Sequence, residues 1–314
     1  MGQPIALVTR LDSVAEEDWL TQIAALLPQE NILSFRAMSA AQKEAAEIAI
    51  VANPDPAQVA ALPRLAWIQS LWAGVERLVD ELGASSPPIV RLVDPELSRV
   101  MAESVLAWTY YLQRDMPAYR GQQAARCWRP LPYRAPSSVR VGVLGLGALG
   151  LAAARRLVDA GFTVSGWSRS PKAVDGINAC CGEDGLTQLL QNADIVVCLL
   201  PLTPQTRGLL HAGRLRAMKA GASLINFARG PIVPAADLIR LLDEKHIAHA
   251  VLDVFDQEPL PEPSELWMHA GVTILPHVAA PTDRCSAARI VADNIKSYRA
   301  TGALPSTVDR ERGY

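Results

Sequence analysis

Arg229, Glu258 and His277 each lie shortly after a short apolar run that is typical of a buried strand. A guanidinium can hold a carboxylate or polarise a carbonyl. A protonated imidazole can deliver a proton, and a carboxylate beside it fixes the ring and stabilises its charged form. Because the carboxyl ends of parallel strands meet at one edge of a sheet, the three side chains are expected to converge there. This combination predicts reduction of a 2-keto acid.

Each of the three residues also has a simpler interpretation. Arg229 could form a surface ion pair, Glu258 could solvate a Pro-rich turn, and His277 alone does not stand out from the other histidines. Only the combination favours catalysis. We predict no metal site, because no histidine or cysteine pair has ligand spacing on one element. The pair His246 and His249 comes nearest, and its spacing is expected to straddle a helix end.

A glycine-rich motif, GLGALG at residues 145–150, follows an expected strand and opens an Ala-rich helix. In that context the first glycine makes a tight turn, the second lets the backbone approach a pyrophosphate, and the third allows close helix–strand packing. The helix N-terminus adds N–H groups and a positive dipole end. We therefore predict dinucleotide binding by Gly145, Gly147, Ala148, Leu149 and Gly150.

The turn after the next expected strand favours NADP over NAD. An NAD site places a carboxylate there for the ribose 2′-hydroxyl, whereas this chain has the sequence WSRSPK at residues 167–172. Arg169 and Lys172 supply positive charge, and Ser168 and Ser170 can hydrogen-bond a 2′-phosphate. The alternative is an ordinary solvated surface turn. With Trp167 at its start, this turn completes the predicted adenosine side of the site.

Short apolar runs alternate with helical patterns along the chain, which is typical of parallel α/β sheets. Expected strands in the first part are residues 5–9, 32–36, 47–51, 66–70 and 89–92, with a helix at 16–27. One long helix is expected over 95–123, interrupted at most near Pro117, followed by a Pro-rich connector. Six further strands are expected at 139–144, 163–167, 195–200, 223–227, 250–254 and 272–275, with a last helix at about 282–300.

These elements predict two doubly wound parallel-sheet α/β domains, in which a Rossmann domain is inserted into a discontinuous flavodoxin-like domain. The substrate domain is expected at 1–100 and 284–314, and the NADP-binding domain at 101–283. Within the latter, residues 101–137 form the long helix and an arm for dimerisation. A length of 314 residues suits two domains.

Composition excludes several classes of protein. The chain is 50% hydrophobic and 20% charged with a net charge of −2, so it lacks the basic surface expected of a nucleic-acid binder. Apolar stretches such as 195–200 are too short to span a bilayer. The start, MGQPIALVTRL, has no signal-peptide pattern. Five cysteines without a CxxC pair are typical of a reducing compartment, and a cytoplasmic protein is expected.

The ordered motifs GLGALG, WSRSPK, NFARGP, DVFDQEPL and LPHVAA resemble the D-isomer-specific 2-hydroxyacid dehydrogenase family over about residues 100–285. The absent acidic residue, the WSRS turn, the Trp-Arg-Pro-Leu arm and the DRERGY ending most resemble its NADPH-dependent glyoxylate/hydroxypyruvate reductase branch. This resemblance implies that NADPH, preferred over NADH, reduces glyoxylate to glycolate and hydroxypyruvate to D-glycerate. The alternatives are a dehydrogenase for a branched or longer 2-keto acid, and a non-catalytic NADP(H)-sensing protein on the same fold.

The resemblance also implies roles for individual residues. Arg229 matches the substrate-binding arginine, His277 the acid/base, and Glu258 the partner that keeps the histidine charged. The loop Trp72-Ala73-Gly74-Val75 matches the place where backbone amides bind the substrate carboxylate. Trp72 is bulkier than is usual at that position, which disfavours larger substrates. Residues that match the nicotinamide and ribose pocket or the hinge beside it are Met101, Leu200, Pro201, Phe227, Ala228, Asp253, Ala279 and Ala280.

Trp128 resembles a tryptophan that reductases of this kind project into the neighbouring subunit's site. Alternatively, it only packs the arm against its partner. The arm is apolar enough to bury against a second copy, so a homodimer is expected.

Overall fold

The computed structural model describes residues 3–310, so the last four residues of the DRERGY ending lie outside the described part of the chain. The chain forms two compact units. The first contains the residues up to Glu96 together with those from Thr282 onward, and the second is Leu97–Pro281. The predicted domain boundaries, after residues 100 and 283, lie a few residues further along the chain than the two boundaries observed in the structure.

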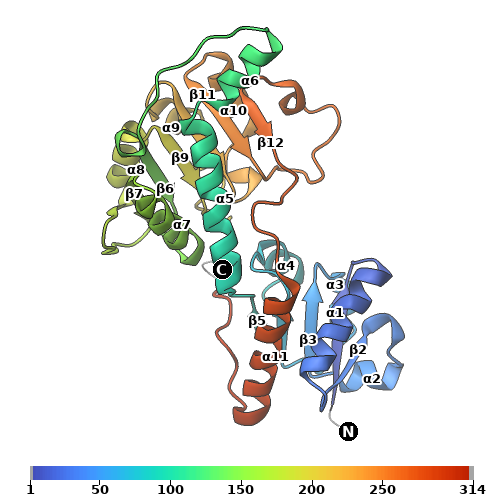
Figure 1. Cartoon of the computed structure of the whole chain (residues 1–314). Helices are drawn as coiled ribbons and strands as arrows, with labels where there is room; N and C mark the ends of the chain where they lie inside the picture. The colour runs from blue at the N-terminus through green and yellow to red at the C-terminus, as the bar shows by residue number, and fades with distance from the viewer. Residues whose placement is uncertain (1–2, 311–314) are drawn as a thin grey trace. The chain divides into compact units, whose positions relative to one another are not determined.

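The first unit is a parallel five-stranded sheet with the order β2-β1-β3-β4-β5, which is the flavodoxin-like order (Figure 1). Its strands are β1 (Pro4–Thr9), β2 (Asn31–Ser34), β3 (Ile48–Ala52), β4 (Trp67–Ser70) and β5 (Ile89–Val90). Its helices are α1 (Ser13–Leu26), α2 (Ala40–Ala45), α3 (Pro56–Ala60), α4 (Glu76–Leu82) and α11 (Arg284–Thr301), with a 3-10 turn η1 (Phe35–Ala37). Strands β1 and β3 are buried along their whole length, which explains their continuous apolar sequences.

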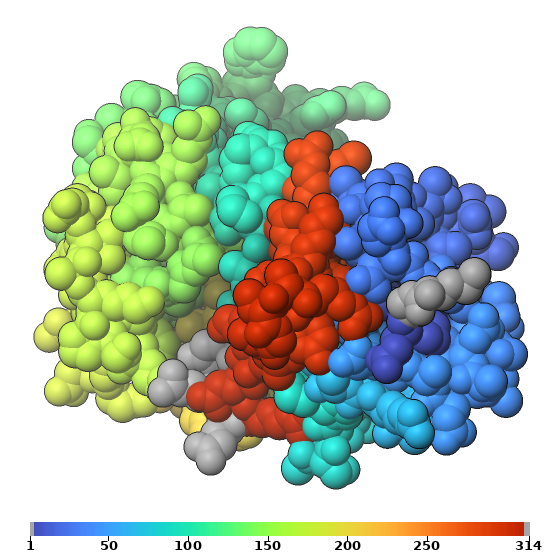
Figure 2. Space-filling model, turned by 90° about the horizontal axis from the view of Figure 1, so that it is seen from below, coloured from blue at the N-terminus to red at the C-terminus, as the bar shows by residue number. Residues whose placement is uncertain are grey.

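Helices from the two ends of the chain share one core of this unit. Trp19 and Ile23 of α1 pack with Val291 and Ile295 of α11 and with the sheet. Figure 2 shows α11, in red, beside the blue N-terminal residues. The first unit is therefore discontinuous in sequence but has common apolar cores.

The second unit is a parallel seven-stranded sheet with the order β12-β11-β10-β9-β6-β7-β8 (Figure 1). Its strands are β6 (Arg140–Leu144), β7 (Thr163–Ser168), β8 (Asn178–Cys181), β9 (Ile195–Cys198), β10 (Ala222–Asn226), β11 (Ile247–Leu252) and β12 (Val272–Ile274). The prediction of six strands missed β8. This edge strand is four residues long and only partly buried, so its sequence, NACC, carries little apolar signal.

Helices cover both faces of this sheet, as in a doubly wound fold. They are α5 (Pro95–Gln113), α7 (Ala148–Asp159), α8 (Gly182–Asn192), α9 (Ala212–Ala217) and α10 (Ala235–Asp243). The unit also contains α6 (Met116–Ala124), which buries none of its residues, and the 3-10 turns η2 (Pro136–Ser138), η3 (Gly230–Ile232) and η4 (Glu265–Met268). Among the described residues, no helix is long and apolar enough to cross a membrane.

The single long helix predicted over 95–123 is two helices. The break lies at Asp115, whose φ of 54° is left-handed, and α6 begins at Met116. Pro117 then occupies the first turn of α6, where its missing N–H is not needed by an intrahelical bond. The interruption expected near Pro117 is therefore the boundary between α5 and α6.

Candidate active site

The loops that carry Arg229, Glu258 and His277 leave three neighbouring strands of the second sheet. Strand β10 pairs with β11 and β11 pairs with β12, all in parallel. The loops after these strands therefore leave from one edge of the sheet, the edge at which ligands bind in open α/β folds.

Glu258 and His277 form the central contact of the site. The Nδ1 atom of His277 lies 2.7 Å from Oε2 of Glu258. The second carboxylate oxygen, Oε1, accepts the backbone N–H of Phe255 at 2.9 Å. With both oxygens engaged, the carboxylate is fixed against the ring, and Nε2 is the ring nitrogen that remains for a substrate. About half of the His277 side chain is exposed, so a substrate can reach it.

Asp253 fixes the backbone that follows His277. Its two carboxylate oxygens accept the N–H groups of Val278 and Ala279 at 2.7 and 2.9 Å. His277 itself has a left-handed φ of 55°, a conformation that a non-glycine residue keeps only when its surroundings impose it. Burial raises the pKa of Asp253, while the two amide donors and His277 oppose that shift. Asp253 therefore acts in the structure as the anchor of the His277 turn.

The turn that carries Arg229 is held by Asn226 at the end of β10. The amide oxygen of Asn226 accepts from the Ala228 N–H, and its amide nitrogen donates to the Arg229 carbonyl, both at 3.2 Å. The Arg229 guanidinium donates to the Ala228 carbonyl at 2.7 Å and is half-buried. These bonds orient the guanidinium before any substrate arrives.

Gly230 lets the Arg229 turn touch the loop that carries Glu258. A Cβ atom at Gly230 would lie 2.0 Å from the Phe255 carbonyl carbon and 2.4 Å from the Asp256 nitrogen, which is impossible without backbone movement. The same Phe255 donates its N–H to Glu258. Gly230 and Asn226 are thus positioning residues, and neither was predicted from the sequence although both lie within the motif NFARGP.

The glycine-rich loop has the geometry that a bound pyrophosphate requires. Gly145 has a φ of 103°, and a Cβ atom at Gly150 would lie 1.7 Å from the Gly145 carbonyl oxygen. A Cβ atom at Gly147 would instead meet no atom within 4 Å, so open space lies beside this residue. Gly147 precedes α7 without a side-chain cap, and both Gly147 and Ala148 are exposed. The first amides of α7 are therefore accessible to an anion, which fits a dinucleotide phosphate.

The turn after β7 combines buried and exposed residues. The Trp167 indole donates to the Gly182 carbonyl at 2.9 Å, and the Ser168 hydroxyl donates to the Ser170 carbonyl at 2.8 Å; both residues are buried. Arg169, Ser170 and Lys172 are exposed. No carboxylate lies at the end of this strand, so the turn offers cationic and neutral groups to a ribose.

Several predicted cofactor residues belong to the core beneath the site. Met101 of α5 packs in one apolar cluster with Phe227 and Ala279, and the Ser104 hydroxyl donates to the Ala279 carbonyl. The remaining residues predicted for the nicotinamide pocket are buried or half-buried at the ends of β9 and β10 and after β12: Leu200, Pro201, Ala228 and Ala280. A hydrophobic floor of this kind can lie against a nicotinamide ring.

In the first unit, the loop 72–75 follows β4 and precedes α4. The Trp72 N–H donates to the Ser70 hydroxyl at 3.0 Å, and the Trp72 ring meets Trp19 edge-on with centroids 6.1 Å apart. Within the described residues, the next three amides, those of Ala73, Gly74 and Val75, have no hydrogen-bond acceptor. Successive amides of this kind can bind a carboxylate.

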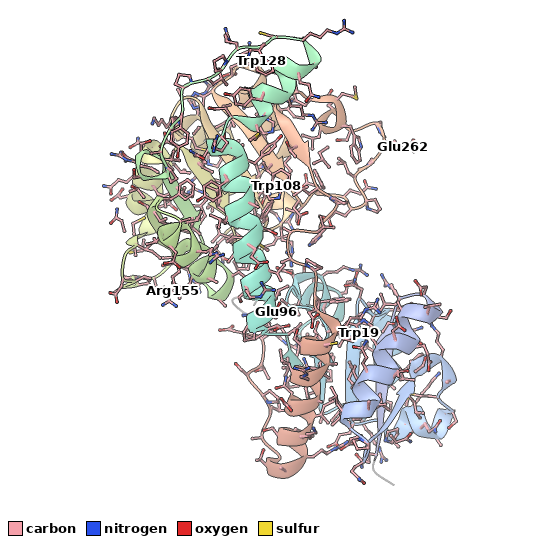
Figure 3. The ribbon with its side chains drawn as sticks, in the orientation of Figure 1. Trp19, Glu96, Trp108, Trp128, Arg155 and Glu262 are labelled. Atoms are coloured by element: carbon pink, nitrogen blue, oxygen red, sulfur yellow. The ribbon has the colours of Figure 1, made fainter. Side chains whose placement is uncertain are left out.

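The described residues contain no group of three or more His, Cys, Asp or Glu side chains that could hold a metal ion. All five cysteines are free thiols. Trp128, on the connector after α6, is almost fully exposed at 99%, and Figure 3 shows it at the outer end of that connector.

The chain is similar to known proteins over nearly its whole length. The family described as D-isomer specific 2-hydroxyacid dehydrogenase, NAD binding domain, matches residues 106–279. Glyoxylate/hydroxypyruvate reductase A from Yersinia enterocolitica is 35% identical over 95% of this chain and 96% of its own. The chain belongs to the D-isomer specific 2-hydroxyacid dehydrogenase family. The resemblance found in the sequence motifs is thereby confirmed.

Two solved structures confirm the fold of this dehydrogenase. A D-isomer specific 2-hydroxyacid dehydrogenase from Xanthobacter autotrophicus, in complex with NADPH and MES, superposes with a TM-score of 0.92 and 38% identity, covering 100% of both chains. An NADPH-dependent glyoxylate/hydroxypyruvate reductase from Sinorhizobium meliloti, in complex with NADP and sulfate, has a TM-score of 0.91 and 30% identity over 100% of both chains. Two parallel-sheet α/β domains are therefore the architecture of this chain.

Proposed function

We propose that this dehydrogenase reduces small 2-keto acids with NADPH, converting glyoxylate to glycolate and hydroxypyruvate to D-glycerate. The observation that carries the proposal is the Glu258–His277 contact of 2.7 Å on the loops beside Arg229. The activities named for the Yersinia enterocolitica and Sinorhizobium meliloti proteins support the same substrates.

Bound NADPH supplies a hydride to the carbonyl carbon of the keto acid. His277 donates a proton from Nε2 to the carbonyl oxygen as negative charge develops on it. Glu258 accepts a hydrogen bond from the Nδ1–H group, which fixes the ring and stabilises its charged form. Arg229 binds the carboxylate or polarises the carbonyl, and its positive charge stabilises the transition state.

The loop 72–75 of the first unit is by itself proposed to bind a carboxylate. The amides of Ala73, Gly74 and Val75 lack acceptors among the described residues and form a nest for an anion. The ring of Trp72, packed on Trp19, adds bulk beside these amides and favours small substrates.

The cofactor preference follows from the turn after β7. A carboxylate there would hydrogen-bond the ribose 2′-hydroxyl of NAD and repel a 2′-phosphate, and this chain has none at residues 167–172. Exposed Arg169 and Lys172 attract a 2′-phosphate instead. The NADP and NADPH in the complexes of the structural relatives support this choice.

The dehydrogenase is further proposed to work as a homodimer in the cytoplasm. Two hydrogen bonds hold the connector after α6 against that helix: the Leu131 N–H donates to the Tyr119 hydroxyl, and the Arg129 N–H donates to the Gln122 side-chain oxygen. Trp128, which lies between α6 and these two residues in the chain, is exposed. Such an exposed indole suits burial in a second copy. Size-exclusion chromatography should show that the wild-type protein is a dimer. The Trp128→Ala variant should elute more as a monomer or show lower turnover.

The deciding experiment is oxidation of NADPH with glyoxylate, hydroxypyruvate, pyruvate and 2-ketoisocaproate in parallel, with NADH beside each. We expect turnover with the first two acids and with NADPH in preference to NADH. Turnover with 2-ketoisocaproate alone would assign a different substrate. Cofactor binding without turnover of any acid would instead indicate a sensor on the same fold.

A further inference from the structure

A cavity of the dehydrogenase lies beside the glycine-rich loop, outside the catalytic loops. It has a volume of about 370 Å³ and is lined by Leu146, Leu151, Arg155, Lys172 and the segment 173–175. A water molecule occupies roughly 30 Å³ in the liquid. The cavity therefore has room for a phosphate group and several waters, and two of its lining side chains are cations.

Lys172 brings the turn after β7 over the glycine-rich loop. Its Nζ atom donates to the Leu146 carbonyl oxygen at 2.6 Å. The Gly145 N–H also donates to the Trp167 carbonyl at 2.8 Å, so the ends of β6 and β7 are joined on the side where a dinucleotide ribose binds. A 2′-phosphate held by Lys172 would thus lie at the cavity.

Arg155 reaches the same cavity from α7. Leu151 and Arg155 are four residues apart and share one face of the helix. Side chains of a helix lean toward its N-terminus, which here is the glycine-rich loop. In the part of the chain that the structure describes, the Arg155 guanidinium has no hydrogen-bond or ion-pair partner. Figure 3 shows Arg155 at the outer side of the second unit.

We infer that Arg155 is a specificity residue for NADP(H), acting with Lys172 as a second cation on the 2′-phosphate. The inference rests on the proposed cofactor preference and adds a residue from another element of the fold. One carboxylate, Asp175, also lines the cavity. Arg155 offsets the negative charge of Asp175 and also attracts the phosphate, because the cavity lining then contains two cations, Arg155 and Lys172, and one carboxylate.

The test measures binding of the adenosine half alone. Adenosine 2′,5′-bisphosphate and adenosine 5′-monophosphate are titrated into the full-length protein by calorimetry. Arg155→Gln should weaken binding of the bisphosphate about tenfold and leave the monophosphate unchanged, because one charge-assisted contact is lost. Asp175→Asn should tighten the bisphosphate.

Arg156→Gln is the matched control, since Arg156 is the next exposed cation on α7 but does not line the cavity. It should leave both affinities unchanged. Equal losses for Arg155→Gln and Arg156→Gln, or an equal loss on both nucleotides, would overturn the role of Arg155. If the wild-type protein itself failed to distinguish the two nucleotides, the proposed NADPH preference would be the part that fails.

Discussion

The catalytic loops and the cofactor-specificity turn lie on one sheet but are held in very different ways. At the catalytic loops, Asn226, Asp253 and Glu258 each fix backbone N–H groups with their side-chain oxygens. On the specificity turn, Arg169 and Lys172 are exposed and lie on a segment without regular structure. Proton donation needs fixed geometry, whereas attraction of a phosphate needs charge within reach. We therefore expect substitutions in the first region to affect turnover and those in the second to affect cofactor choice.

His277→Ala should produce the largest effect. Loss of a positioned general acid lowers kcat by about 10²–10⁴-fold. NADPH affinity should change little, because the specificity turn is untouched. Steady-state kinetics with glyoxylate and a separate NADPH titration check the two parts. Turnover within tenfold of wild type would remove His277 from its assigned role.

Gly230→Ala should have the next largest effect on turnover, because it displaces backbone without removing a charged or hydrogen-bonding side chain. The added Cβ atom would lie 2.0 Å from the Phe255 carbonyl carbon, so the Glu258 loop must move. A displacement of about 1 Å at a reacting group can lower kcat by around 10²-fold, and overpacking costs about 1–3 kcal/mol of stability.

Gly121→Ala is the control for that variant. A Cβ atom at Gly121, in α6, would meet nothing within 4 Å, and alanine favours a helix. Its turnover and thermal midpoint should match or exceed those of the wild type. Normal turnover in Gly230→Ala would break the proposed contrast, because the catalytic loops would then tolerate displacement.

Glu258→Gln should change the pH dependence more than the maximum rate. The amide can still accept the Phe255 N–H, but the negative charge beside His277 is lost. Because the protonated imidazole is then less stable, the alkaline decline of keto acid reduction should begin at lower pH. Rate profiles across pH test this. Glu262→Gln, which removes an exposed charge from the same loop region (Figure 3), should leave the profile unchanged.

The contrast between the two regions also explains what could be predicted from the sequence. The glycine-rich motif and the His277 and Arg229 motifs are local signals, so their elements could be identified from spacing. The strand β8 could not, because four small, partly exposed residues leave no apolar pattern. The close contact of Gly230 with Phe255 joins residues distant in sequence, and the Arg155 side of the cavity depends on how α7 packs. Contacts of that kind follow from the fold and not from any motif.

Arg169→Gln should have the smallest effect and the most selective one. KM for NADPH should rise about tenfold while KM for NADH stays the same, because only a 2′-phosphate contact is lost. The free energy of unfolding should change by no more than about 0.5 kcal/mol, as is usual for an exposed substitution. Urea unfolding and parallel kinetics with both cofactors measure these quantities. A loss of stability comparable to that of Gly230→Ala would mean that the specificity turn is as tightly constrained as the catalytic loops, and cofactor choice would then be a property of backbone geometry as well as of charge.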